Sequence, residues 1–175
     1  MNKTVFTGSG VAIVTPFSGN TVNYDEFEKL IEYQIKNETD AIIVCGTTGE
    51  ASTMPDREHI EAIRFTVEKV AKRVPVIAGI GSNDTEHGIN LCKEVAKTGV
   101  DAFLNVTPYY NKANASGLEQ HFRKMSTCTD IPTILYNVPG RTGMNISLSV
   151  LDKLKDIDTI VGLKEASGNF SYTME

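Results

Sequence analysis

Short hydrophobic runs alternate with amphipathic segments along the whole chain. The six runs lie at about 11–14, 40–45, 75–80, 102–106, 132–136 and 160–164, and each is a continuous stretch of mainly apolar residues. Continuous runs of this kind are typical of parallel strands whose two faces are both covered. Because segments of helical period separate them, the pattern predicts an α/β protein with a parallel sheet.

The segments between the runs carry helix start and stop signals. Asn23 with Glu26, and Ser116 with Glu119, have the spacing of a capping box. Pro55 suits the first turn of a helix, and Gly99 suits a C-terminal cap. The predicted helices start near 23, 55, 83, 116 and 147, and the first, second and last end near 37, 73 and 155.

Two architectures fit this alternation, an open doubly wound sheet and a (β/α) barrel. No Gly-x-Gly-x-x-Gly follows the first strand, which weakens the dinucleotide-binding version of the open sheet. The unusual loops follow the second, fourth, fifth and sixth strands at the end where a barrel gathers its active site, so we expect a (β/α)8 TIM barrel. A barrel needs eight strands and about 250 residues. We therefore expect residues 1–175 to be its N-terminal part, truncated after about the sixth strand.

Composition and charge exclude several classes of function. The chain has 41% hydrophobic and 22% charged residues and a net charge of −5, without a basic block, so we expect no nucleic-acid partner. No apolar run approaches the roughly 20 residues that span a bilayer, and the N-terminus lacks the apolar segment of a signal peptide. Three widely spaced cysteines fit a reducing cytoplasm, and the histidines lack the spacing of a metal site.

The sixth run ends in Lys164, and a lysine is costly to bury at the end of an apolar strand. Either the strand ends there and the amine reaches water, or desolvation lowers the pKa of the amine. A neutral amine attacks carbonyl carbons and forms a Schiff base. The other strand-end residues bear on this choice.

Several strand-end loops carry residues suited to binding or proton transfer. The segment 46–50, with Thr47 and Thr48 between two glycines, is either a backbone nest for a carboxylate or an ordinary turn in which Thr47 caps and Glu50 bonds back. Tyr136 is either a core-edge tyrosine or a proton relay. Arg141 is either solvated or grips a carboxylate.

Two further features are less specific. Tyr109 and Tyr110 are adjacent and should point opposite ways, one packing and the other entering a site or an interface. Cys45 is interpreted as a small buried packing residue rather than a nucleophile. Together these loops place an amine, a phenol, paired hydroxyls and an arginine at one end of the predicted barrel.

Four ordered motifs resemble the dihydrodipicolinate synthase family. They are Gly-Thr-Thr-Gly-Glu at 46–50, Val-Thr-Pro-Tyr-Tyr-Asn at 106–111, Leu-Tyr-Asn-Val-Pro-Gly-Arg-Thr-Gly at 135–143 and Val-Gly-Leu-Lys-Glu-Ala at 161–166. The resemblance implies a (β/α)8 barrel with a C-terminal helical domain, which is absent here, and usually a cytoplasmic homotetramer. It implies a lyase that condenses pyruvate with L-aspartate-4-semialdehyde, the committed step toward diaminopimelate and lysine. It implies no metal and no organic cofactor.

The resemblance also implies roles for single residues. Lys164 forms the imine with pyruvate, Tyr136 relays protons through the Thr47 hydroxyl, and Tyr110 completes the relay from a neighbouring subunit. Thr47 and Thr48 hold the pyruvate carboxylate, and Arg141 holds that of the semialdehyde. Residues of the family's lysine-effector site are matched by Ala51, Ser52, His59, Asn83 and Tyr109.

Two effector positions depart from the family pattern. Asp56 stands where inhibited members often carry histidine, and His87 where they carry glutamate. Loss of that carboxylate removes a partner for the ammonium of lysine, so we expect weak or absent feedback.

Two other interpretations remain open. The chain could be another pyruvate-dependent aldolase, acting on N-acetylneuraminate or a keto-deoxy sugar acid, although Arg141 suits a small second substrate with a carboxylate. It could also be a catalytically inert fragment or an assembly piece.

Overall fold

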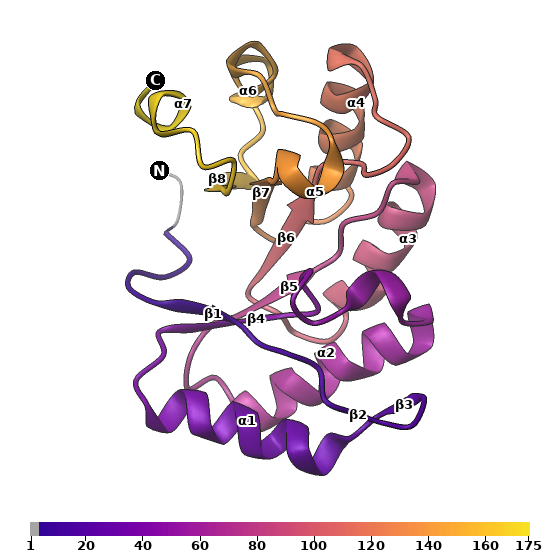
Figure 1. Cartoon of the computed structure of the whole chain (residues 1–175), viewed down its shortest axis with the longest axis vertical. Helices are drawn as coiled ribbons and strands as arrows, with labels where there is room; N and C mark the ends of the chain where they lie inside the picture. The colour runs from indigo at the N-terminus through magenta and orange to yellow at the C-terminus, as the bar shows by residue number, and fades with distance from the viewer. Residues whose placement is uncertain (1–3) are drawn as a thin grey trace.

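Six parallel strands form the centre of the computed structural model, which describes residues 4–175 (Figure 1). The strands are β1 (Gly10–Ala12), β4 (Ala41–Val44), β5 (Val76–Gly79), β6 (Ala102–Val106), β7 (Thr133–Asn137) and β8 (Ile160–Glu165). The main helices are α1 (Tyr24–Lys36), α2 (Asp56–Val70), α3 (Thr85–Ala96), α4 (Ala115–Ser126) and α6 (Leu148–Leu154). Both sets agree with the predicted alternation.

The order of the strands decides between the two predicted architectures. Each strand pairs in parallel with the next one along the chain, in the order β1-β4-β5-β6-β7-β8. An open doubly wound sheet reverses its strand order at a switch point, and the described sheet has no such reversal. Right-handed crossovers in one direction keep the helices on one side, and Figure 1 shows them following one another around the outside of the sheet. This is the α/β arrangement of a (β/α)8 barrel with six of its strands present.

Four short elements were not predicted. They are the antiparallel hairpin of β2 (Phe17–Ser18) and β3 (Thr21–Val22), the 3-10 helix η1 (Ala51–Thr53), α5 (Pro139–Thr142) and α7 (Phe170–Met174). Each is too short for a hydrophobic period to appear in the sequence. Both η1 and α5 lie in loops at the carboxyl ends of strands.

Some helix ends differ from the prediction. The predicted cap Asn23 is confirmed, since its side chain accepts from the N–H of Glu26. Helix α4 is capped by Asn114 and not by Ser116, because the Asn114 carboxamide accepts from the N–H of Gly117 at 2.8 Å. Helix α3 ends at the cap Lys97, so Gly99 lies in the turn beyond it and is not its cap. Helix α2 starts after Pro55, and its last residue is Val70 with Ala71 as the C-cap, slightly before the predicted end near 73.

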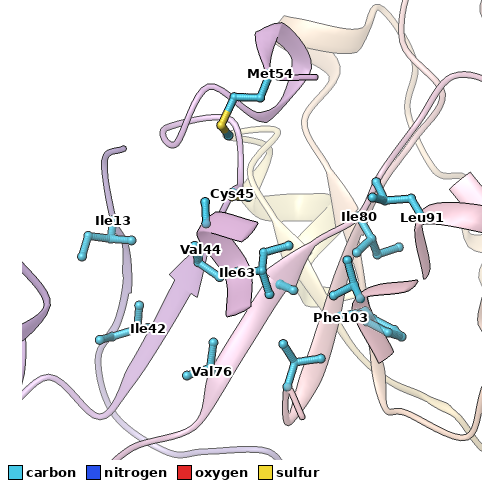
Figure 2. Close-up of a cluster of buried hydrophobic side chains, with 14 of the residues drawn as sticks. Ile13, Ile42, Val44, Cys45, Met54, Ile63, Val76, Ile80, Leu91 and Phe103 are labelled. Atoms are coloured by element: carbon cyan, nitrogen blue, oxygen red, sulfur yellow. The ribbon is translucent and has the colours of Figure 1, made fainter. Parts of the chain in front are cut away.

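The largest core lies between the sheet and the outer helices. Figure 2 shows part of it, in which Val44 of β4 lies next to Ile63 of α2, with Ile42 of β4 and Phe103 of β6 on either side. A separate cluster covers the inner face of the sheet and includes Ile43, Ile77, Leu104 and Tyr136. Because successive strand residues face opposite sides, the residues beside the outward ones point to the inner face, where the candidate site lies.

In residues 4–175, none of the helices combines the length and the apolar character needed to cross a bilayer.

Candidate active site

Lys164 and Tyr136 lie opposite each other at the ends of neighbouring strands. The register of β7 and β8 pairs their Cα positions, and the Nζ atom of Lys164 lies 4.3 Å from the centre of the Tyr136 ring. Their side chains therefore share the inner face of the sheet. The sequence predicted both residues, but only the register brings them together.

The surroundings of Lys164 favour its neutral form. The side chain is half-buried, and it lines a cavity of about 410 Å³ with Ile43, Ile77, Leu104 and Ile134 among its walls. Desolvation in this apolar setting lowers the pKa of Lys164 from its usual range. This is the direction of shift that the desolvated-amine explanation requires.

Tyr136 connects this amine to a second cavity. That cavity has a volume of about 240 Å³, and Thr47, Tyr136, Tyr109 and Arg141 contribute to its lining. Leu104 lines both cavities, so they lie on the two sides of this inner-face residue, with Lys164 lining the first and Tyr136 the second. Tyr136 is only 7% exposed. A phenol, a hydroxyl and a guanidinium thus surround a space next to the amine.

The loop after β4 needs two unusual backbone features. Cys45 has φ +52°, and a Cβ atom added at Gly79 of β5 would lie 2.0 Å from the Cys45 carbonyl oxygen. Only glycine allows the two strands to approach so closely there. The Cys45 thiol is buried, which raises its pKa to about 12, so it acts as a packing residue, as the sequence indicated.

The segment 46–50 forms a turn that neither predicted alternative describes fully. The N–H of Gly49 donates to the carbonyl of Gly46 at 3.0 Å, and that of Glu50 donates to the carbonyl of Thr47 at 3.2 Å. These two N–H groups are therefore not free for a carboxylate. The capping-box interpretation is also wrong, because the N-cap of η1 is Glu50 and not Thr47, and no side chain caps this helix. Thr47 and Thr48 are both exposed, and of the two only Thr47 lines the cavity.

Arg141 is held over the cavity by α5. The N–H groups of Arg141 and Thr142 donate to the carbonyl of Val138 at 2.9 and 3.1 Å, and Gly143 ends the turn with φ +69°. The side chain of Arg141 is exposed and lines the 240 Å³ cavity. An exposed guanidinium at the rim of a cavity can form two hydrogen bonds to an entering carboxylate.

Tyr109 and Tyr110 point in different directions, as predicted. Tyr109 is half-buried and lines the 240 Å³ cavity, whereas Tyr110 is 90% exposed. Tyr110 has φ +74°, a left-handed conformation that is unusual for a bulky residue. Within one chain, the Tyr110 ring therefore does not enter the site that contains Tyr136.

The five matched effector residues differ in their surroundings, and only three of them line the 240 Å³ cavity. Ala51, Ser52 and Tyr109 line the 240 Å³ cavity, and the Asn83 carbonyl accepts from the side chain of Asn111 at 3.0 Å. His59 is 4% exposed, and its Nε2 lies 2.8 Å from the Gly79 carbonyl oxygen. Burial lowers the pKa of His59, so its ring is a neutral packing group.

The two departing effector positions are paired with each other. The Nε2 atom of His87 lies 2.9 and 3.0 Å from the two carboxylate oxygens of Asp56, and its Nδ1 lies 2.9 Å from the Ser82 hydroxyl. A carboxylate therefore remains beside His87 and comes from α2 rather than α3. Position 87 itself lacks the carboxylate, as the sequence shows, and the feedback expectation stays a prediction.

Two site residues were missed from the sequence. Asn137 follows Tyr136, is fully buried, and hydrogen-bonds to the Glu165 side chain next to Lys164. A buried polar residue that ends an apolar run is a usable signal, but its partners are far away in the chain.

Within residues 4–175, no group of three or more potential side-chain ligands is arranged to hold a metal ion.

Comparison with known proteins gives the same motifs a family context. A sequence model of the Dihydrodipicolinate synthetase family matches residues 5–175. The chain is 57% identical over 169 residues to the 4-hydroxy-tetrahydrodipicolinate synthase of Acetivibrio thermocellus, covering 97% of this chain and 58% of that protein. The chain therefore spans less than two thirds of the length of this relative.

Solved structures agree with the sequence comparison. The dihydrodipicolinate synthase of Acinetobacter baumannii, solved as a complex with pyruvate, superposes with a TM-score of 0.93 at 44% identity, over 97% of this chain and 58% of that one. The lysine-bound enzyme of Cyanidioschyzon merolae gives a TM-score of 0.93 at 42% identity, over 97% and 59%. The chain, with its six parallel strands and its paired Lys164 and Tyr136, belongs to the dihydrodipicolinate synthetase family.

Proposed function

We propose that this chain carries the Schiff-base site of a lyase that condenses pyruvate with L-aspartate-4-semialdehyde. The observation that carries this proposal is the half-buried Lys164 amine, 4.3 Å from the Tyr136 ring and lowered in pKa by desolvation. The relatives named 4-hydroxy-tetrahydrodipicolinate synthase support this choice of product. Pyruvate as the first substrate is supported by the Acinetobacter baumannii enzyme, which was solved with pyruvate bound.

The first steps need a neutral amine and a proton shuttle. The Lys164 amine attacks the keto carbon of pyruvate, and the carbinolamine loses water to give an imine. A methyl proton leaves to give an enamine. The Tyr136 ring lies 4.3 Å from the amine, and Thr47 lines the same cavity as Tyr136. Proton transfer through these hydroxyls follows from the general acid–base role of a positioned phenol.

The second half of the reaction uses the carboxylate of the semialdehyde. The enamine carbon attacks the aldehyde, and the new C–C bond regenerates the imine at Lys164. The substrate's own amine then displaces Lys164 and closes the ring of 4-hydroxy-tetrahydrodipicolinate. Arg141 at the rim of the 240 Å³ cavity binds the semialdehyde carboxylate. Thr47 and Thr48 bind the pyruvate carboxylate; Thr47 already lines this cavity, and Thr48 is on the same turn.

The remaining assignments complete the proposal. The reaction is the committed step of diaminopimelate and lysine biosynthesis in the cytoplasm, without a metal or organic cofactor. The full-length protein is a homotetramer, and Tyr110 enters the site of a neighbouring subunit. The 90% exposure of Tyr110 supports this role, because its ring is free to contact a second copy.

Borohydride trapping tests the proposal. The chain is incubated with pyruvate and reduced, and intact and peptide masses are measured, with Lys155 as an internal exposed lysine. We expect a pyruvyl adduct on Lys164 alone. Absence of the adduct on this chain and on a chain extended to the length of the relatives would reject Lys164 as the nucleophile. A substrate panel on the longer chain then separates this reaction from cleavage of N-acetylneuraminate or keto-deoxy sugar acids.

A further inference from the structure

Asn137 ends β7 and is fully buried, with every hydrogen-bonding group of its side chain engaged. Its Nδ2 donates to Asn145 Oδ1 at 2.7 Å and to Glu165 Oε2 at 2.7 Å. Its Oδ1 accepts from the backbone N–H of Ile146 at 3.0 Å. A carboxamide with two donors that are both in use, in a dry setting, allows little rotation of the side chain.

These contacts join two parts of the candidate site. The loop 138–145 carries Arg141, and it begins directly after Asn137 and returns to it through Asn145 and Ile146. The third contact reaches Glu165, the residue that follows Lys164 in β8. One side chain therefore closes the Arg141 loop and also holds the end of the strand that presents the amine.

Asn137 lies on the opposite face of the sheet from Tyr136 and Lys164. Tyr136 and Lys164 are paired across the strands on the inner face, and Asn137 is paired with Glu165 in the next register position. Since strand residues alternate between faces, Asn137 and Glu165 lie on the outer side of the sheet. The backbone strengthens this link, because the Asn137 carbonyl accepts from the N–H of Ala166 at 2.9 Å.

The charge on Glu165 is held in place by the same contacts. Desolvation alone would raise the pKa of Glu165, but hydrogen bonds from Ser167 and Asn137 outweigh it and lower the pKa. The carboxylate is therefore ionised at neutral pH and accepts from both partners. A charged acceptor gives the Asn137 contact a stronger and more directional hydrogen bond than a neutral one.

We infer that Asn137 is a positioning residue that holds the Lys164 strand and the Arg141 loop in a single arrangement. This inference rests on the proposed function for the roles of Lys164 and Arg141. It predicts that loss of the Asn137 contacts lets the end of β8 move and water reach the amine. Reactivity of Lys164 and binding at the Arg141 loop should change together, although Asn137 touches neither side chain.

The test compares variants that keep the net charge of the natural chain. Asn137→Leu removes all three side-chain contacts at similar size. The double variant N137D/E165Q reverses donor and acceptor, so that the amide at position 165 donates to the new carboxylate. Competitive labelling with acetic anhydride across pH, read by peptide mass, gives the apparent pKa of Lys164 without any use of pyruvate.

We expect the Lys164 midpoint of Asn137→Leu to rise by about one pH unit toward the ordinary lysine value. At neutral pH this lowers the fraction of neutral amine, and the rate of pyruvate trapping, about tenfold. The double variant should restore the natural midpoint. A folded Asn137→Leu variant with an unchanged Lys164 midpoint overturns the inference. If Asn137→Leu does not fold, the folded double variant decides the question. A Lys164 midpoint in that variant at the ordinary lysine value overturns the inference.

Hydrogen exchange on the natural chain gives an independent measurement. The Ile146 amide should be as protected as the amides of β8, because Asn137 binds it in a buried setting. Free exchange at Ile146 would also overturn the inference. A low Lys164 midpoint with no pyruvate adduct, on this chain and on a chain extended to the length of the relatives, would instead reject the proposed reaction, while the labelling data would still decide the role of Asn137.

Discussion

The Nζ atom of Lys164 lies 4.3 Å from the centre of the Tyr136 ring, because the register of β7 and β8 places the two residues side by side. The amine is thus next to a phenol and apolar side chains rather than next to a carboxylate. Desolvation lowers its pKa, whereas a nearby carboxylate would raise it. From this arrangement we predict both the reactivity of Lys164 and its effect on the stability of the fold.

Replacement of Lys164 by methionine should abolish pyruvate trapping and stabilise the fold. A lysine whose pKa is lowered in the folded state binds fewer protons than in the unfolded state. Its destabilising effect is therefore full below the folded pKa and disappears above the unfolded value of about 10.4. We expect a gain of about 0.5–2 kcal/mol in unfolding free energy at pH 7. Urea denaturation at pH 7 and pH 10 measures it; an equal gain at both values would contradict the desolvation argument.

Replacement of Arg141 by alanine should weaken the second substrate selectively. Hydrogen bonds to charged groups contribute about 1.5–3 kcal/mol, so KM for L-aspartate-4-semialdehyde should rise about tenfold to hundredfold in a full-length enzyme. Pyruvate trapping on Lys164 should be nearly unchanged, because Arg141 lies at the rim of the neighbouring cavity. Arg141→Lys is the matched control and should recover only part of the loss, since an ammonium cannot bind a carboxylate in the two-pronged manner. If pyruvate trapping fell by the same factor as KM for the semialdehyde rose, Arg141 would not be specific for the second substrate.

Gly79 and Gly140 offer a matched pair of glycines near the site. A Cβ at Gly79 would lie 2.0 Å from the Cys45 carbonyl oxygen, whereas one at Gly140 meets nothing within 4 Å. Gly79→Ala should cost about 1–3 kcal/mol or more, because backbone must move. Gly140→Ala should be neutral or stabilising by up to about 1 kcal/mol. Thermal unfolding of both variants gives the comparison, and a Gly79→Ala variant as stable as Gly140→Ala would show that the sheet yields easily there.

His121 should make the fold sensitive to mild acid. Its ring is 3% exposed, and desolvation lowers its pKa to about 4, against a smaller opposing effect of Asp84. The unfolded state takes up a proton near pH 6.5 and the folded state only near pH 4. Stability is therefore lost as pH falls through this window, by up to about 3 kcal/mol.

Urea denaturation between pH 7 and pH 4 checks the His121 prediction. In His121→Gln, the unfolding free energy should fall less between pH 7 and pH 4 than in the natural chain. The control His87→Gln, which replaces a partly exposed ring, should show most of the natural loss. An unchanged pH slope in His121→Gln would assign the acid sensitivity to another group.

Lysine binding at the predicted effector region should be weak, because the Asp56 carboxylate is already engaged by His87 at 2.9 Å. An incoming ammonium must displace that ring. Isothermal titration of L-lysine into full-length protein should therefore show weak binding, and His87→Ala should strengthen it by freeing the carboxylate. Asp56→Asn is the control that should remove the gain. Tight binding to the natural protein would contradict the weak-feedback expectation.

The sequence by itself determined the class of the fold and most of the candidate chemistry. Continuous apolar runs predicted all six parallel strands, because a strand that is buried on both faces consists mainly of apolar residues. The helical period of apolar residues predicted the five longer helices. The motifs around Lys164, Tyr136 and Arg141 marked the strand ends. Short elements such as α5 left no periodic signal, and the caps of α3 and α4 depended on local geometry that several polar residues could satisfy.

Only the tertiary structure decided how those residues act together. Strand register set the contact between Lys164 and Tyr136, and the apolar inner face lowered the pKa of the amine. The bonds from Asn137 to Glu165, and from His87 to Asp56, join residues 28 and 31 positions apart. Side-chain partners at such separations depend on how whole elements pack. A local pattern fixes where a strand ends, but the electrostatic setting of its last residue is created by neighbours from the rest of the chain.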